Sequence, residues 1–207
     1  MSYDVSDWIG RLSSRSDLTH SIFHLTRPAG DKSAVDVLIK ILCEKTIIAS
    51  KPAEAFIIGD RGAACFQNIP LYSICQNLKF EREYKERKGY DKTRYTGVGL
   101  GFQVNYAFAL GCRPVIYEDK NVAKNILPPE EHWRVVHYSP NTTTPVDWSH
   151  EREWRFPGNF VFARKTAHVI LESAENYKEF IEKSTPLKDI DLVNEVRSIT
   201  CLEALFY

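Results

Sequence analysis

The sequence lacks the features of a membrane protein, a secreted protein or a general nucleic-acid coat protein. Its 27 basic and 27 acidic side chains give a formal net charge of zero, whereas a coat protein for nucleic acid is normally clearly basic. No apolar run approaches the roughly 18–20 residues that a membrane span requires. The first ten residues, MSYDVSDWIG, have neither the basic start nor the apolar stretch of a secretory signal. We therefore expect a cytoplasmic protein that does not associate with membranes.

The sequence also lacks a cysteine pattern that would indicate disulfides or a metal site. Its five cysteines are odd in number, far apart and without a CxxC pair; they are Cys43, Cys65, Cys75, Cys112 and Cys201. That spacing predicts reduced thiols, and no metal is expected. Cys65 is a candidate for a thiol hydrolase, but its small apolar surroundings (GAACFQ) favour an inert buried thiol. We expect none of the five to be bridged or essential.

The composition indicates a globular protein. The chain has 207 residues, of which 43% are hydrophobic, and this length favours one domain. Within it we expect an N-terminal arm at 1–20, a core of catalytic type at 21–171 and C-terminal helices at 172–207.

The order of the predicted elements favours an α+β fold. Helices are predicted from Ser33 to about Lys45, where Ser33 and Asp36 resemble a capping box, from Pro70 to about residue 79, and as a pair within 173–205. Strands are predicted at 21–26, 46–49, 56–58, 62–67, 98–102, 113–118, 132–138, 150–156, 159–164 and 167–171. The strands after residue 132 follow one another without intervening helices, and Pro157-Gly158 is typical of a hairpin turn. This order predicts mixed or antiparallel sheets with flanking helices rather than a doubly wound sheet.

The densest group of ionisable residues is DWSHEREWR at 147–155. If it enters a strand, Glu151 and Glu153 project to one face, and two carboxylates one pleat apart repel each other. Such a pair suits the stabilisation of a positively charged, sugar-like transition state. On this basis, replacement of Glu153 by Gln should leave folding intact. The alternative is a solvated strand face in which Arg152 and Arg155 are counter-charges, an arrangement that is common on protein surfaces.

A second candidate site is His24-Leu25-Thr26-Arg27. On a strand, His24 and Thr26 share a face, and Arg27 follows where its planar guanidinium can bind a diphosphate. The alternative is a core histidine that is hydrogen-bonded to the backbone.

Two further patterns are weaker evidence for a functional site. GVGLG at 97–101 lacks the spacing of a dinucleotide-binding turn and no βαβ unit surrounds it. Residues 79–94 carry seven basic and four acidic side chains and are a candidate phosphate-binding stretch. Mixed charge of this kind on a helix is usually a solvated face.

Taken together, several short segments carry a resemblance to a known family. They are FHLTR, ACFQNIPL, YTGVGLGF, RPVIYE and DWSHEREWRF. The chain resembles the bacterial abortive phage-infection family of the AbiGi type over most of residues 21–163. Its layout is similar to that of the ADP-ribosyltransferase superfamily, especially the toxins that modify DNA thymidine, although a middle-strand Ser-Thr-Ser motif is absent. The resemblance implies an ADP-ribosyltransferase-like fold.

The resemblance also implies a substrate, NAD, and a role for individual residues. Glu153 would hold a hydroxyl of the nicotinamide ribose and stabilise the oxocarbenium ion, while Glu151 would orient the acceptor or water. The adenosine-side ribose would contact His24, and Thr26 would help to seat the nicotinamide end. Arg27 or Arg94 would bind the diphosphate. The middle segment would supply an aromatic ring, Phe102 or Tyr106, and Tyr106 would stack on nicotinamide.

Two functions from different classes follow. The first is an NAD-consuming ADP-ribosyltransferase or NAD glycohydrolase that acts as a toxin or anti-phage effector, with a protein, DNA, RNA or water as acceptor and an antitoxin or a phage-derived trigger as a possible partner. The second is a non-catalytic module that binds a nucleotide or a partner protein. A third, an RNA-processing phosphotransferase, would need a basic cleft, which the neutral net charge disfavours.

Overall fold

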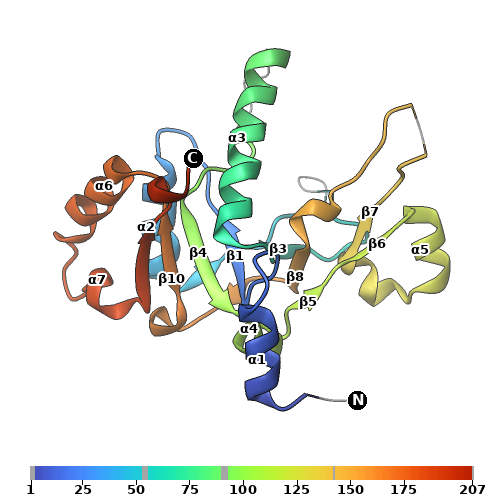
Figure 1. The fold of residues 1–207 in the computed structure, drawn as a ribbon, viewed down its shortest axis with the longest axis horizontal. Helices are drawn as coiled ribbons and strands as arrows, with labels where there is room; N and C mark the ends of the chain where they lie inside the picture. Colours follow the sequence, from blue (N-terminus) through green and yellow to red (C-terminus); the bar gives the residue numbers. More distant parts are fainter. Residues whose placement is uncertain (1–2, 53–55, 90–92, 142, 207) are drawn as a thin grey trace. The chain divides into compact units, whose positions relative to one another are not determined.

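The computed structural model describes residues 3–52, 56–89, 93–141 and 143–206. The chain divides into two compact units, each assembled from segments that are distant in sequence. The first unit contains residues 1–45, 69–103 and 162–207, and the second contains residues 46–68 and 104–161. Figure 1 labels most of the helices and strands of both.

The first unit contains four strands in the order β11-β10-β4-β1. They are β1 (Ser21–Leu25), β4 (Gly99–Gln103), β10 (His168–Leu171) and β11 (Ser198–Cys201). β4 is antiparallel to both β1 and β10, whereas β10 and β11 are parallel. The sheet is therefore mixed.

Five α-helices of the first unit accompany these strands. They are α1 (Val5–Ser13), α2 (Ala34–Glu44), α3 (Leu71–Lys88), α6 (Ala174–Ser184) and α7 (Leu192–Glu195). The predicted capping box of α2 is confirmed, because the Asp36 backbone N–H donates to Ser33 Oγ (3.1 Å) and the Ser33 backbone N–H donates to the Asp36 carboxylate (2.8 Å). α2 and α6 pack against each other.

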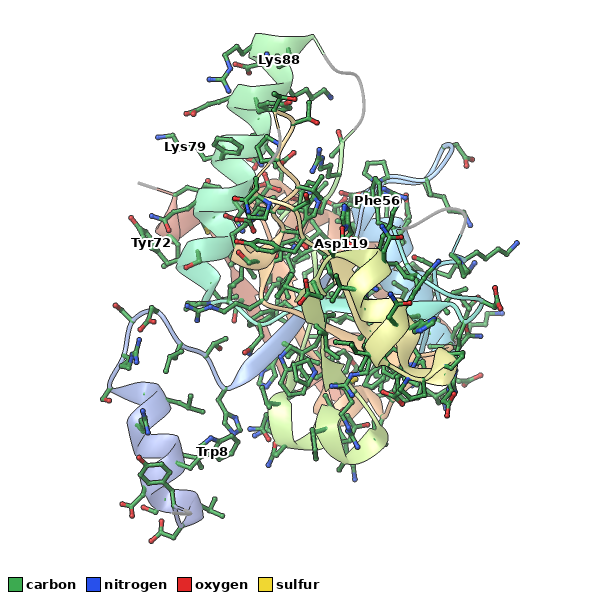
Figure 2. All side chains as sticks on the ribbon, turned by 90° about the vertical axis from the view of Figure 1, so that its right-hand side faces the viewer. Trp8, Phe56, Tyr72, Lys79, Lys88 and Asp119 are labelled. Carbon is green, nitrogen blue, oxygen red and sulfur yellow. The ribbon has the colours of Figure 1, made fainter. Side chains whose placement is uncertain are left out.

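The helix α3 is longer than the sequence predicts. Only Ile74, Cys75 and Leu78, all in its first half, are buried, and they pack in one cluster with Phe23 of β1 and Ile170 of β10. The charged second half remains helical because its acidic and basic side chains recur at helical spacing and have high helix propensity. Figure 2 shows labelled Tyr72, Lys79 and Lys88 spaced along this helix.

The glycines of β4 permit a close approach of its neighbours. A Cβ atom on Gly99 would lie 2.2 Å from the carbonyl oxygen of His24 and 3.0 Å from Cα of Leu25. A Cβ atom on Gly101 would lie 2.6 Å from the ring of Phe23. The pairing of β1 with β4 therefore depends on the absence of a side chain at Gly99, and the position of the Phe23 ring depends on its absence at Gly101.

The second unit is built from short strands. β3 (Ala63–Gln67), β8 (Glu153–Pro157) and β5 (Arg113–Pro114) form an antiparallel group in the order β3-β8-β5. Two further pairs are antiparallel β2 (Thr46–Ile47) with β9 (Phe160–Val161), and parallel β6 (Ile116–Glu118) with β7 (Val135–His137). The helices are α4 (Val104–Leu110), α5 (Lys120–Ile126) and the 3₁₀ helices η1 (Pro129–Arg134) and η2 (Ser149–Glu151).

The predicted α+β class is confirmed, with mostly antiparallel pairing.

Three local predictions are wrong. The segment 56–58 is not a strand. Pro157-Gly158 does not close a hairpin, because β8 pairs with β3 and β5 while β9 pairs with β2. Residues 198–201 form a strand rather than part of a helix, because this segment pairs with β10 and its β-branched Ile199 and Thr200 suit a strand. Within the described residues, no helix combines the length and apolar character needed to cross a membrane.

We expect Gly99→Ala to lower the free energy of unfolding by about 2–3 kcal/mol, because the new methyl group meets backbone that cannot move aside cheaply. For a chain of this size that is a fall in melting temperature of roughly 5–10 °C. The matched control is Gly10→Ala in α1, where nothing lies within 4 Å of the added Cβ and alanine favours the helix. Thermal unfolding checks both, and equal melting temperatures for the two variants would contradict this account of β4.

Candidate functional site

The strands β3 and β8 share a polar face. Because successive side chains of a strand point to opposite faces, Glu153 and Arg155 lie on one face and Trp154 on the other. The antiparallel register places Gln67 opposite Glu153 and Cys65 opposite Arg155. Directly opposite residues project to the same side of the sheet. We call these four side chains the polar face of β3 and β8.

The other face of the same two strands is apolar and aromatic. Phe66 lies opposite Trp154, and its ring makes an edge contact with Phe160 at a centroid distance of 5.1 Å. Trp154 contacts Phe108 at 6.5 Å, and the guanidinium of Arg113 lies 4.0 Å from the Phe108 ring centroid. Aromatic contacts of this kind fix the strand beneath the polar face.

Glu153 and Arg155 form a buried bidentate ion pair. Arg155 Nε and Nη2 donate to the two carboxylate oxygens of Glu153 at 2.8 and 3.2 Å. The side chain of Arg155 is 4% exposed and that of Glu153 is 11% exposed. Arg155 Nη1 also donates to the carbonyl oxygens of Trp133 (2.8 Å) and Val135 (3.1 Å). Burial alone lowers the pKa of Arg155, but the charge of Glu153 raises it, and the balance lies above the ordinary value for arginine. The guanidinium therefore stays charged, and the bidentate geometry orients both side chains.

Two neighbouring groups are protonated at neutral pH. The Tyr117 hydroxyl accepts the backbone N–H of Glu153 at 2.8 Å, and burial raises the pKa of Tyr117 to about 12. Burial also raises the pKa of the Cys65 thiol well above its usual range, and the nearby Glu153 charge adds to this effect. Since the thiolate is the reactive form, Cys65 lacks the character of a nucleophile.

Gln67 carries an unsatisfied acceptor. Its side chain is 7% exposed, and its Oε1 atom has no hydrogen-bond partner among the described residues. A buried polar atom without a partner is rare and calls for an explanation such as a bound ligand. Little in the sequence points to this residue, because Gln67 is a single polar residue at the end of an apolar strand. Tyr117 likewise shows no local signal beyond its place in a predicted strand.

Glu151 and Glu153 do not share a strand face, which corrects the sequence-based expectation. Glu151 ends the 3₁₀ helix η2, and Arg152 adopts a left-handed conformation (φ 45°) before β8 begins at Glu153. The backbone carbonyls of Glu151 and Arg152 both face the N–H of Asn68, at 3.3 and 3.2 Å. The turn breaks the alternation of a strand, so the spacing of two residues no longer implies a common face.

The first unit contains His24, Thr26, Arg27, Arg94 and Phe102. His24 lies opposite Leu100, half-buried, near the end of β1. The Thr26 hydroxyl lies at hydrogen-bond distance from the carbonyl oxygens of Ala34 (3.0 Å) and Val98 (3.1 Å), and the residue is 3% exposed, so this hydroxyl anchors the backbone.

Of the remaining three, Phe102 is fully buried and its ring makes an edge contact with Phe162 at 5.0 Å. Arg94 pairs with Glu81 (Nε to Oε2, 3.4 Å), and Arg27 is exposed at the end of β1. Tyr106 belongs to the second unit and lies on the helix α4 rather than on a strand. The structure brings only Glu153 of the predicted site residues into the polar face of β3 and β8.

No group of three or more potential metal ligands occurs in the described part of the chain. Comparisons with protein-family models, with curated proteins and with solved structures each found no match. The chemistry of the site therefore has to be inferred from its own residues.

We expect Glu153→Gln to lower the free energy of unfolding by about 3–5 kcal/mol, because it leaves the buried Arg155 charge uncompensated. This reverses the expectation from the sequence that folding would be unaffected. The matched control is Glu131→Gln, which breaks the more exposed pair with Arg134 (3.0 Å) and should cost at most about 1 kcal/mol. Denaturant unfolding compares the two. A double variant, Glu153→Leu with Arg155→Met, should recover much of the loss, and similar losses for both single variants would contradict the buried pair.

Proposed function

We propose that this protein is an NAD-consuming ADP-ribosyltransferase or NAD glycohydrolase, with Glu153 as the carboxylate that acts on the nicotinamide ribose. The observation that supports this proposal is the carboxylate of Glu153 at the start of β8, which Arg155 holds in a bidentate pair. The carboxylate of Glu153 accepts two hydrogen bonds from Arg155 and one from the Cys65 thiol, and a carboxylate has about four acceptor sites, so it retains the capacity to bind a substrate hydroxyl.

The chemistry that this carboxylate would perform is the cleavage of a glycosidic bond. As nicotinamide departs with the bonding electrons, positive charge develops on the ribose ring, and a preorganised negative group stabilises it. Arg155, with Tyr117 at the Glu153 backbone, holds the carboxylate region in place before substrate binds. In the cell, such an activity fits a bacterial toxin or an anti-phage effector. The roles that the resemblance implies for His24, Arg27 and Arg94 remain predictions.

A second candidate function is a non-catalytic module that binds a nucleotide or a partner protein. Three observations favour it. Arg155 offsets the charge of Glu153, the Thr26 hydroxyl is engaged with backbone carbonyls, and Phe102 is buried in its unit. A module of this kind would bind NAD or another nucleotide without releasing nicotinamide.

The direct test is the release of nicotinamide from NAD by the purified protein, with protein, DNA, RNA and water each supplied as acceptor. We expect Glu153→Gln to reduce turnover by roughly two to three orders of magnitude, because a preorganised charge of this kind contributes about 3–4 kcal/mol. Glu151→Gln should reduce transfer to the acceptor more than hydrolysis.

Because Glu153→Gln also weakens folding, turnover is measured well below the melting temperature and per folded molecule. Glu153→Asp keeps the charge but shortens the side chain by one methylene group. It therefore shows whether turnover depends on the position of the carboxylate in a protein whose Arg155 still has a counter-charge. Glu131→Gln is the control that should keep full turnover. Equal turnover by wild type and folded Glu153→Gln contradicts the role of Glu153. An inactive wild type that binds NAD favours the binding module.

A further inference from the structure

Gln67 and Glu153 place two hydrogen-bond acceptors side by side. They are directly opposite each other on β3 and β8, where facing Cβ atoms are about 4.5–5.5 Å apart. Their side chains have the same number of carbon atoms, so the carboxamide and the carboxylate have the same reach from the backbone. Oε1 of Gln67 is buried without a partner in the described part of the chain, and the Glu153 carboxylate, which accepts two hydrogen bonds from Arg155 and one from Cys65, retains capacity for one more.

We propose that Gln67 and Glu153 form a subsite for the cis-diol of a ribose ring. In this subsite Glu153 accepts a hydrogen bond from the 2′-hydroxyl, and Gln67 accepts one from the neighbouring 3′-hydroxyl. The assignment to the nicotinamide ribose rests on the proposed function, whereas the recognition of a cis-diol rests only on the two acceptors.

The chemistry of the two acceptors selects among possible ligands. A ligand must offer two donors on adjacent atoms, one for each strand. A ligand ammonium or guanidinium group is disfavoured, because the charge of Arg155 lies against the same carboxylate. A primary amide carries both of its donor hydrogens on one nitrogen and would serve one acceptor well. The vicinal hydroxyls of ribose are neutral and adjacent, so they fit both acceptors without adding charge.

The unsatisfied oxygen of Gln67 gives this subsite a distinctive thermodynamic signature. Removing a buried acceptor that has no partner does not cost a hydrogen bond in the free protein, but it does remove one from the complex. A purely structural glutamine would behave in the opposite way, since its loss would weaken folding and leave ligand affinity unchanged.

The variant that tests the proposal is Gln67→Met, which keeps the unbranched shape and removes the acceptor. We expect a melting temperature equal to or above that of wild type, and affinity for NAD about tenfold lower, measured by calorimetry. An NAD analogue without the 3′-hydroxyl on the nicotinamide ribose should bind wild type and Gln67→Met equally, because the partner of Gln67 is missing in both cases. The control Gln76→Leu, at an exposed glutamine of α3, should bind NAD as wild type does.

The outcomes separate this proposal from the proposed function. A lowered melting temperature with unchanged affinity identifies Gln67 as structural and overturns the subsite. Unchanged affinity in a stable Gln67→Met also overturns it, and nicotinamide release by wild type would then still support the enzyme.

If wild type neither binds nor cleaves NAD, the proposed function fails, and adenosine with 3′-deoxyadenosine becomes the probe pair. A preference of wild type for adenosine that disappears in Gln67→Met supports the cis-diol subsite independently. Equal binding of the two nucleosides, or no binding of either, overturns it.

Discussion

The polar face of β3 and β8 depends on the buried ion pair between Glu153 and Arg155. Removing two charges from water costs several kcal/mol per ion, and only good geometry offsets that cost. Here the geometry is bidentate, and the carbonyl oxygens of Trp133 and Val135 accept the remaining donors on Arg155 Nη1. One guanidinium thereby connects β8 to the end of η1 and to β7. The orientation of Glu153, and with it any chemistry of this face, follows from that connection.

Local signals in the sequence predicted the elements whose formation is decided locally. The α2 helix was predicted from Ser33, Asp36 and its apolar stripe, and the capping box forms as expected. The strands β1 and β4 match the predicted strands at 21–26 and 98–102, and the glycines of β4 permit the close approach of β1. In each case the deciding interaction is between residues near in sequence or is a steric property of one residue.

The sequence did not predict features that depend on pairing between distant segments. The strand β11 lies parallel to β10, and its β-branched Ile199 and Thr200 form too short a run to indicate a strand without that pairing. The same limit applies to the candidate site. The spacing of Glu151 and Glu153 indicated a shared face only if no turn intervened, and the left-handed Arg152 breaks the strand there. Gln67 gained its place opposite Glu153 only from the register of β3 with β8.

The ion pair also bears on how strongly Glu153 can stabilise positive charge. At an effective dielectric constant of about 20, a unit charge about 3.5 Å from the carboxylate is attracted by roughly 5 kcal/mol, and a guanidinium about 6 Å away repels it by roughly 3 kcal/mol. Glu153 and Arg155 together would then stabilise the positive charge by about 2 kcal/mol. Removing Glu153 alone, however, deletes the whole attractive part and leaves the repulsion. A large loss in a Glu153 variant therefore measures the carboxylate in the presence of Arg155, and a buried counter-charge is compatible with a catalytic carboxylate as long as it lies farther from the reacting ring.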